Sequence, residues 1–124
     1  MLRTLLLIAL GGAIGSVLRF LTSSIVQKYY PTVFPTATLV VNVIGCFLIG
    51  ILVGLLDKYQ LSNHNLKWFL ITGFCGGFTT FSAFGIENVA LFQTNHSGLA
   101  FLYIAASVIV GLFAVWLGLF LVKV

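Results

Sequence analysis

Four long apolar segments make up nearly all of this 124-residue chain, and they fix its fold class. They cover roughly residues 2–25, 38–56, 67–92 and 98–122. Each approaches or exceeds the about 20 residues that a helix needs to cross the hydrocarbon core of a bilayer. Only 6% of the residues are charged, and the mean hydropathy of +1.18 is far above that of soluble domains. The sequence therefore predicts an all-α integral membrane protein, a single transmembrane domain over residues 1–124 with four spans.

The charged and aromatic residues at the span ends indicate a lipid partner rather than nucleic acid. The net charge of +4 comes mostly from basic residues at the predicted ends, where they are typical of headgroup anchors: Arg3, Lys28, Lys58, Lys67 and Lys123. Tyr29, Tyr30, Tyr59 and Trp68 fall at similar depth, as in an aromatic belt. With four spans, both termini and the middle connection lie on one side, which carries all these basic residues except Lys28. This imbalance predicts cytoplasmic termini in a plasma membrane protein.

The third segment contains a run that does not suit a continuous membrane helix. Gly73, Gly76 and Gly77 weaken the helix, and the hydroxyls of Thr79 and Thr80 compete for backbone groups. A break at this depth is tolerated only where protein or a water-lined cavity surrounds it, and it releases backbone carbonyls. Carbonyl oxygens are hard cation ligands, and no carboxylate lies nearby to favour a divalent ion. A monovalent cation such as Na⁺ fits this set best.

An aromatic stripe follows the predicted break. Phe78, Phe81 and Phe84 recur every three residues, and Asn88 and Phe92 continue the pattern along one side of a helix. Such stripes usually pack against lipid or core. However, an aromatic ring has a positive edge, so rings turned edge-on can line a path for an anion. We assign Glu87, near the far end of this span, to the membrane interface.

The first span carries a polar face with one permanent charge. Gly12, Ser16, Arg19 and Ser23 are spaced by four, three and four residues, so they share a side of the helix. A guanidinium near mid-membrane costs at least about 2.5 to 3.5 kcal/mol unless it finds acceptors or water. Arg19 is either a structural clamp on backbone oxygens or a charge that attracts an anion. We favour the clamp, because a permanent charge in contact with an anion would also trap it.

The second and fourth spans add hydrogen-bond donors and small residues. Thr38, Asn42 and Gly45 share one face, and the Asn42 amide is either an interhelical link or a pore donor. In the fourth span, Tyr103 and Ser107 lie above small residues, and their hydroxyls suit an anion or an interhelical bond equally. The glycine pairs predict close helix packing, Gly11 with Gly15 and Gly50 with Gly54. Cys46 and Cys75, without metal-ligand spacing, are expected to be apolar fillers.

The side chains expected inside the bundle favour transport over catalysis. They include donors, aromatic edges, one fixed cation and released carbonyls, but no set of residues for nucleophilic or acid–base chemistry. This combination suits a small, strongly hydrated anion, whose water shell is replaced ligand by ligand. One alternative is a proton-coupled four-helix multidrug exporter, which needs a carboxylate within the membrane. Another is a structural subunit without transport, which leaves the interrupted third span unexplained.

These residues carry a family resemblance. The run Gly73 to Phe84, GFCGGFTTFSAF, closely resembles the GFCGGxTTFSTF signature of the CrcB/Fluc fluoride channels. Further matches are the first-span glycines leading to Arg19 and the second-span run Thr38 to Asn42. The chain departs from the pattern where Ala83 replaces a threonine, where Gly85 replaces a frequent serine and where Ala37 replaces a common glycine.

The resemblance implies both an assembly and a site. The assembly is a dual-topology dimer of two antiparallel copies, or of this chain and an oppositely oriented relative, with two fluoride pores and a central Na⁺. By matching positions, the carbonyls of Gly76 and Thr79 would hold the Na⁺, and Arg19 would be structural. The residues implied for the fluoride pathway are Phe81 and Phe84 as the pore phenylalanines, Asn42 as the amide that orients them, and Thr38, Tyr103 and Ser107 as polar lining. Such a channel would release F⁻ from the cytoplasm and protect against fluoride toxicity.

Overall fold

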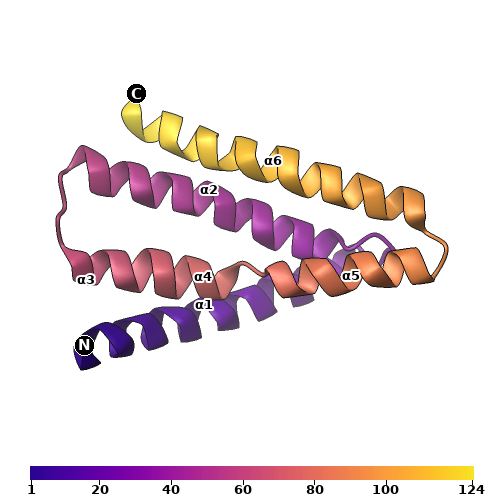
Figure 1. Cartoon of the computed structure of the whole chain (residues 1–124), viewed down its shortest axis with the longest axis horizontal. Coiled ribbons are helices and arrows are strands. Elements are labelled where there is room, and N and C mark those ends of the chain that lie inside the picture. Colours follow the sequence, from indigo (N-terminus) through magenta and orange to yellow (C-terminus); the bar gives the residue numbers. More distant parts are fainter.

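The computed structural model describes all 124 residues and is entirely helical (Figure 1). Three of its spans are single helices: α1 (Leu2–Tyr29), α2 (Thr36–Lys58) and α6 (Ser97–Lys123). The third span, His64–Gln93, is built from α3 (His64–Lys67), the π-helix η1 (Trp68–Cys75), α4 (Gly76–Phe78) and α5 (Phe81–Gln93). All four spans are long and apolar enough to cross a membrane, which confirms the predicted four-helix architecture.

The helices run alongside one another, and the connections alternate between the two ends of the bundle. Figure 1 shows both termini at the same end as the connection from α2 to α3. The α1–α2 and α5–α6 connections lie at the opposite end. The prediction that the termini and the middle connection share one side is therefore confirmed. Helix α2 packs mainly along α6, and α1 packs along η1 and α4.

Glycines allow backbones to touch where the helices meet. A Cβ atom at Gly15 would overlap the carbonyl of Phe74, and one at Gly77 would overlap the carbonyl of Gly12. The α2–α6 contact is similar, because a Cβ at Gly50 would overlap the Val115 carbonyl. Helices in lipid have no hydrophobic driving force to associate. The van der Waals contacts that small residues allow between the backbones hold them together instead. The predicted role of the glycine pairs in packing is confirmed.

The third span breaks within the predicted run, at its two threonines, whereas the two glycines just before them stay helical. Thr79 (φ −79°, ψ 158°) and Thr80 (φ −148°, ψ 116°) are extended, whereas Gly76 and Gly77 are helical. Gly77 serves the contact with α1 rather than unwinding the chain. The helix restarts with Thr80 as its N-cap, whose Oγ1 accepts a hydrogen bond from the Ala83 amide at 3.2 Å.

Candidate functional site

Asn42 on α2 holds the broken backbone from the side. Its Nδ2 donates to the Thr80 carbonyl at 3.1 Å, and its Oδ1 accepts from the Thr80 amide at 2.8 Å. One amide side chain thus satisfies both backbone groups of an extended residue inside the bundle, where water is scarce. Of the two roles left open for Asn42, the interhelical link is present in the structure. One Nδ2 hydrogen is left for another acceptor.

Four carbonyls at the break, those of residues 76 to 79, lose the amides that would bond them in a continuous helix, and Gly76 and Thr79 are two of these residues. The Thr80 amide would donate to Gly76 O, but it donates to Asn42 Oδ1. The Ala83 amide would donate to Thr79 O, but it donates to Thr80 Oγ1. Gly76 and Thr79 are the two residues whose carbonyls the family resemblance assigns to a cation. The break therefore produces acceptor oxygens at both of these residues.

The polar face of α1 contacts the same break. Arg19 Nη1 donates to Thr79 O at 3.5 Å, and Ser16 Oγ donates to Gly77 O at 3.4 Å. Gly12 lies against Gly77, one turn before Ser16. The guanidinium thus makes the backbone contact expected of a clamp. Both bonds are long, so the carbonyls keep acceptor capacity for other partners.

A cavity of about 440 Å³ opens beside the break, and most of the predicted site residues line it. Its walls come from α2, the third span and α6, and they include Asn42, Gly76, Thr79, Phe81, Phe84 and Ser107. The Ser107 hydroxyl oxygen is buried and has no hydrogen-bond partner. A buried hydroxyl without a partner costs free energy unless a ligand or water satisfies it, so Ser107 is available to donate a hydrogen bond into this cavity.

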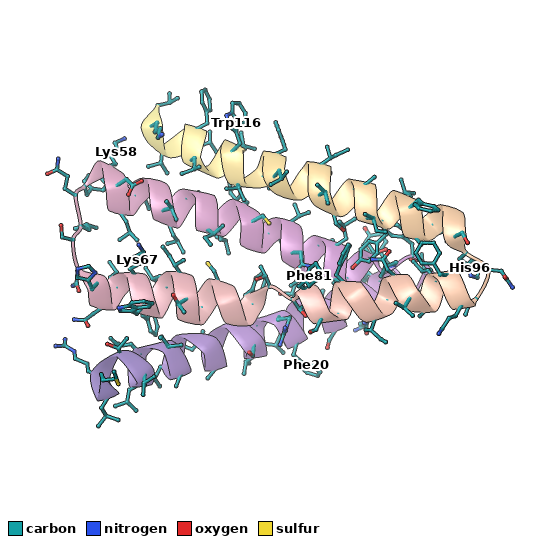
Figure 2. The ribbon with its side chains drawn as sticks, viewed as in Figure 1. Phe20, Lys58, Lys67, Phe81, His96 and Trp116 are labelled. Atoms are coloured by element: carbon teal, nitrogen blue, oxygen red, sulfur yellow. The ribbon has the colours of Figure 1, made fainter.

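The phenylalanines divide at the break instead of forming one stripe. The rings of Phe81 and Phe84 lie 5.5 Å apart, and the Phe84 ring lies 5.0 Å from that of Tyr103. Phe78 is buried and stacks on Phe74 at 6.1 Å. Its inclusion in the stripe was wrong, because two extended residues between Phe78 and Phe81 cancel the helical register. Figure 2 shows Phe81 at the break, midway along the bundle.

Three helices meet at a second polar cluster that the sequence interpretation missed. Glu87 on α5 accepts hydrogen bonds from Thr38 Oγ1 at 2.6 Å and from Tyr103 Oη at 2.8 Å. Glu87 is half-buried near the end of the bundle that holds the α1–α2 and α5–α6 connections, so its depth agrees with the expected interface, but its bonds to two buried hydroxyls of other spans were not predicted. Thr38 and Tyr103 do not line the cavity beside Asn42. The sequence did contain a signal for this cluster. A carboxylate within an apolar segment needs polar partners, and other spans offer hydroxyls.

Known proteins resemble this chain along nearly its whole length. Residues 6–119 match the family model described as "CrcB-like protein, Camphor Resistance (CrcB)". A fluoride-specific ion channel FluC of Flavobacterium psychrophilum is 53% identical over 122 residues, covering 98% of both chains. FluC proteins of Azobacteroides pseudotrichonymphae and Methylobacillus flagellatus are each 48% identical, covering 99% and 95% of this chain and 98% and 93% of their own.

The four apolar helices and these relatives together define the class of protein. The range matched by the family model, residues 6–119, contains all the residues of the site described above. The chain is a multi-pass protein of the bacterial plasma membrane, and its relatives are channels rather than enzymes. It belongs to the CrcB family.

Proposed function

We propose that this protein is a fluoride-selective channel that lets F⁻ leave the cytoplasm passively. Its FluC relatives are named as fluoride-specific ion channels, and the chain matches them over nearly its full length. The observation that carries the proposal is the cavity beside the break, where the unpartnered Ser107 hydroxyl, the Asn42 amide and the Phe81 and Phe84 rings lie together. These groups offer hydrogens to an anion without a fixed charge in the lining.

The absence of charge among these groups matters for the rate of ion passage. A hydroxyl, an amide hydrogen and the positive edges of aromatic rings each replace part of the hydration shell of F⁻. None of them binds the anion as strongly as a guanidinium would, so the ion can leave as well as enter. Arg19, which is held at Thr79 O, belongs to the scaffold rather than to the path of the ion.

The membrane potential supplies enough free energy for passive export. Neutral HF crosses bilayers and ionises in the cytoplasm, which leaves F⁻ inside. Moving one charge through 100 mV corresponds to about 2.3 kcal/mol, or roughly a 50-fold concentration ratio at equilibrium. A channel in a cell that is negative inside therefore keeps cytoplasmic F⁻ low without proton coupling.

The working unit in this proposal is a dimer of two antiparallel copies. The cavity is open at the bundle surface, Gly76 is exposed, and the Phe81 side chain is 81% exposed. In a single chain an anion in this cavity would face lipid, where charge is strongly disfavoured. A second copy placed on this face would close the pathway. An oppositely oriented relative would serve the same purpose.

A Na⁺ ion between the two copies fits the oxygen atoms that the break releases. Gly76 O and Thr79 O have lost their helical donors, and neutral carbonyls suit a monovalent alkali cation. These two residues from each copy would hold the ion, which would lock the two broken spans together. Dialysis against Na⁺-free, K⁺-free buffer should then lower the thermal stability of the purified protein, and Na⁺ should restore it better than Li⁺ or K⁺.

A proton-coupled multidrug exporter is the alternative from a different class. Glu87, which accepts hydrogen bonds from hydroxyls of two other spans, is the carboxylate within a span that such an exporter needs. However, this carboxylate is already bound by two hydroxyls, and the curated relatives are fluoride channels. The channel is therefore the better supported function.

Ion efflux from liposomes that contain only this protein tests the proposal. The vesicles are loaded with potassium fluoride, and valinomycin carries the balancing charge. We expect rapid F⁻ efflux at equal pH on both sides, and little efflux from vesicles loaded with chloride. F⁻ movement that requires a pH gradient would indicate coupled transport. Efflux no faster than from empty liposomes would refute the channel function.

A further inference from the structure

A second and larger cavity lies far from the break, at the end of the bundle that carries both termini. It has a volume of about 720 Å³ and lies between the last turns of α2 and the beginning of the third span. Figure 2 shows Lys58 and Lys67 at this end, on either side of the α2–α3 connection. The two cavities adjoin at Ile71, which lines both, but the charged residues of the second cavity are not among those proposed for the fluoride pathway.

The wall of this cavity changes from polar to apolar with depth. Asp57, His64 and Lys67 line its outer part, together with polar residues of the connection. Val53 precedes Asp57 by four residues, and Ile71 follows Lys67 by four residues toward the membrane centre. Four helical residues correspond to about 6 Å, so charged groups lie one turn above apolar ones. This order matches the change from headgroup to acyl chain in a lipid monolayer.

The charged groups of the cavity have no partners within the protein. No salt bridge of 4.0 Å or less forms in the structure, so Asp57 and Lys67 are unpaired. Lys58, in contrast, is engaged, since its Nζ donates to Val122 O at 2.7 Å. The cavity thus presents one free carboxylate and one free ammonium group, with the His64 ring beside them. A ligand that carries both signs of charge would complement it.

The loop that forms the outer wall is held in place by its own hydrogen bonds. The Leu61 amide donates to Leu56 O at 2.9 Å, and the Ser62 amide donates to Gln60 O at 2.8 Å. Asn63 caps the next helix by accepting from the Asn65 amide at 3.1 Å. The cavity is therefore already formed in the protein and does not depend on a ligand to order the loop.

We propose that this cavity binds the headgroup of a zwitterionic aminophospholipid from the surrounding membrane. Lys67 and His64 contact the phosphate, Asp57 accepts hydrogen bonds from the primary ammonium, and Val53 and Ile71 contact the start of an acyl chain. Tyr59 and Trp68 are exposed and neighbour the lining residues Gln60 and Lys67 in the sequence, and such aromatic residues are typical of the headgroup depth that this arrangement needs.

The charge pattern distinguishes this lipid from other sources of phosphate. An anionic headgroup would pair with Lys67 but would bring negative charge to Asp57. A choline headgroup has no N–H to donate to the carboxylate. Free phosphate would use none of the apolar wall. Only an aminophospholipid offers a phosphate to Lys67, an N–H donor to Asp57 and an acyl chain to the apolar residues together.

Native mass spectrometry of the delipidated protein tests this site directly. Phosphatidylethanolamine, phosphatidylglycerol and phosphatidylcholine with identical chains are added one at a time. We expect ethanolamine lipid to bind about fivefold more tightly than the other two. Asp57→Asn should remove this preference, and Lys67→Gln should weaken the ethanolamine and glycerol lipids alike. Lys123→Gln, which removes a charge at the same end outside the cavity, should change neither.

Several outcomes would overturn the proposal. One is equal binding of the three lipids by the unchanged protein, and another is unaltered binding in both cavity variants. Displacement of the lipid by millimolar inorganic phosphate would assign the site to a free anion instead. Gel filtration of each variant verifies folding.

Tryptophan fluorescence gives an independent measurement. The Trp116→Phe variant keeps Trp68 as its single tryptophan, and brominated ethanolamine lipid should quench the fluorescence of Trp68 at a lower mole fraction than brominated choline lipid.

Discussion

At the scale of single residues, the polar groups near the break differ in whether the protein already satisfies them. Asn42 and Arg19 bond to backbone groups that the break exposes, so they contribute to the fold as well as to the site. Ser107 has no such bond, although its hydroxyl is buried in the cavity wall. A buried polar group that lowers stability and has no hydrogen-bond partner in the protein is the stronger candidate for binding a ligand.

Replacing Ser107 with alanine separates these two roles. Ser107→Ala removes a buried hydroxyl that has no protein partner, so the unfolding free energy should rise, by about 1 kcal/mol, rather than fall. If the hydroxyl binds F⁻, losing one hydrogen bond should slow efflux about tenfold. The exposed Ser24, whose hydroxyl bonds only to Phe20 O at 2.8 Å, provides the control Ser24→Ala. Unchanged efflux in Ser107→Ala would remove this residue from the pathway.

Asn42→Asp should affect both transport and stability. The carboxylate cannot donate to Thr80 O, and its charge would face that carbonyl and repel an anion in the cavity. We expect F⁻ efflux to be abolished and the protein to lose about 1 to 3 kcal/mol of stability. Asn63→Asp is the matched control, because a carboxylate caps a helix as well as an amide does. Liposome efflux and thermal melting in detergent report the two effects separately.

Phe81→Ile tests whether an aromatic edge is needed. The Phe81 side chain is 81% exposed in one chain, so an aliphatic replacement should barely affect the fold of that chain. Isoleucine has no ring with a positive edge, and F⁻ efflux should fall by at least about tenfold. The exposed Phe20, on α1, gives the control Phe20→Ile. Equal efflux in both variants would show that Phe81 has only a packing role.

At the scale of helices, the packing of α1 on the third span fixes where the break falls. Gly15 and Gly77 bring the two backbones into contact, which places Ser16 and Arg19 on the carbonyls of Gly77 and Thr79. The unwound residues are then held between this contact and Asn42 on α2. The break is thus a product of two neighbouring helices rather than of local helix propensity alone.

Gly77→Ala tests the backbone contact. The new methyl group would overlap the Gly12 carbonyl, so α1 has to move away from the third span. Overpacking of this kind costs about 1 to 3 kcal/mol, and the displaced Arg19 should also reduce F⁻ efflux. Gly98→Ala is the control, because no atom lies within 4 Å of its added methyl group. A melting temperature for Gly77→Ala equal to that of the control would contradict the close contact.

Periodicity and composition predicted those parts of the fold that depend on one helix at a time. The four spans, the glycine contacts and the inward face of α1 follow from the spacing of residues within a segment. The position of the break does not, because Asn42 and Thr80 are 38 residues apart and only the folded chain brings them together. The location of Phe78 and the partners of Glu87 were missed for the same reason.

At the scale of the whole molecule, the distribution of charge conflicts with the proposed assembly. Both termini and the α2–α3 connection lie at one end, which carries Arg3, Lys58, Lys67 and Lys123 against Lys28 at the other. This bias favours insertion with the termini in the cytoplasm. However, Lys58 is bonded to Val122 O, and the others lie at or near helix ends. An antiparallel dimer of identical chains nevertheless requires both orientations.

Labelling of single cysteines in intact cells decides between these orientations. Lys28→Cys and Lys123→Cys are placed in a background without Cys46 and Cys75, and a membrane-impermeant maleimide is added outside. If identical chains form the antiparallel dimer, each cysteine should be about half labelled, because each end of the bundle faces outward in half of the copies. Complete labelling at residue 28 with none at residue 123 would mean a single orientation. The antiparallel homodimer would then be wrong, and an oppositely inserted relative would be needed to close the cavity.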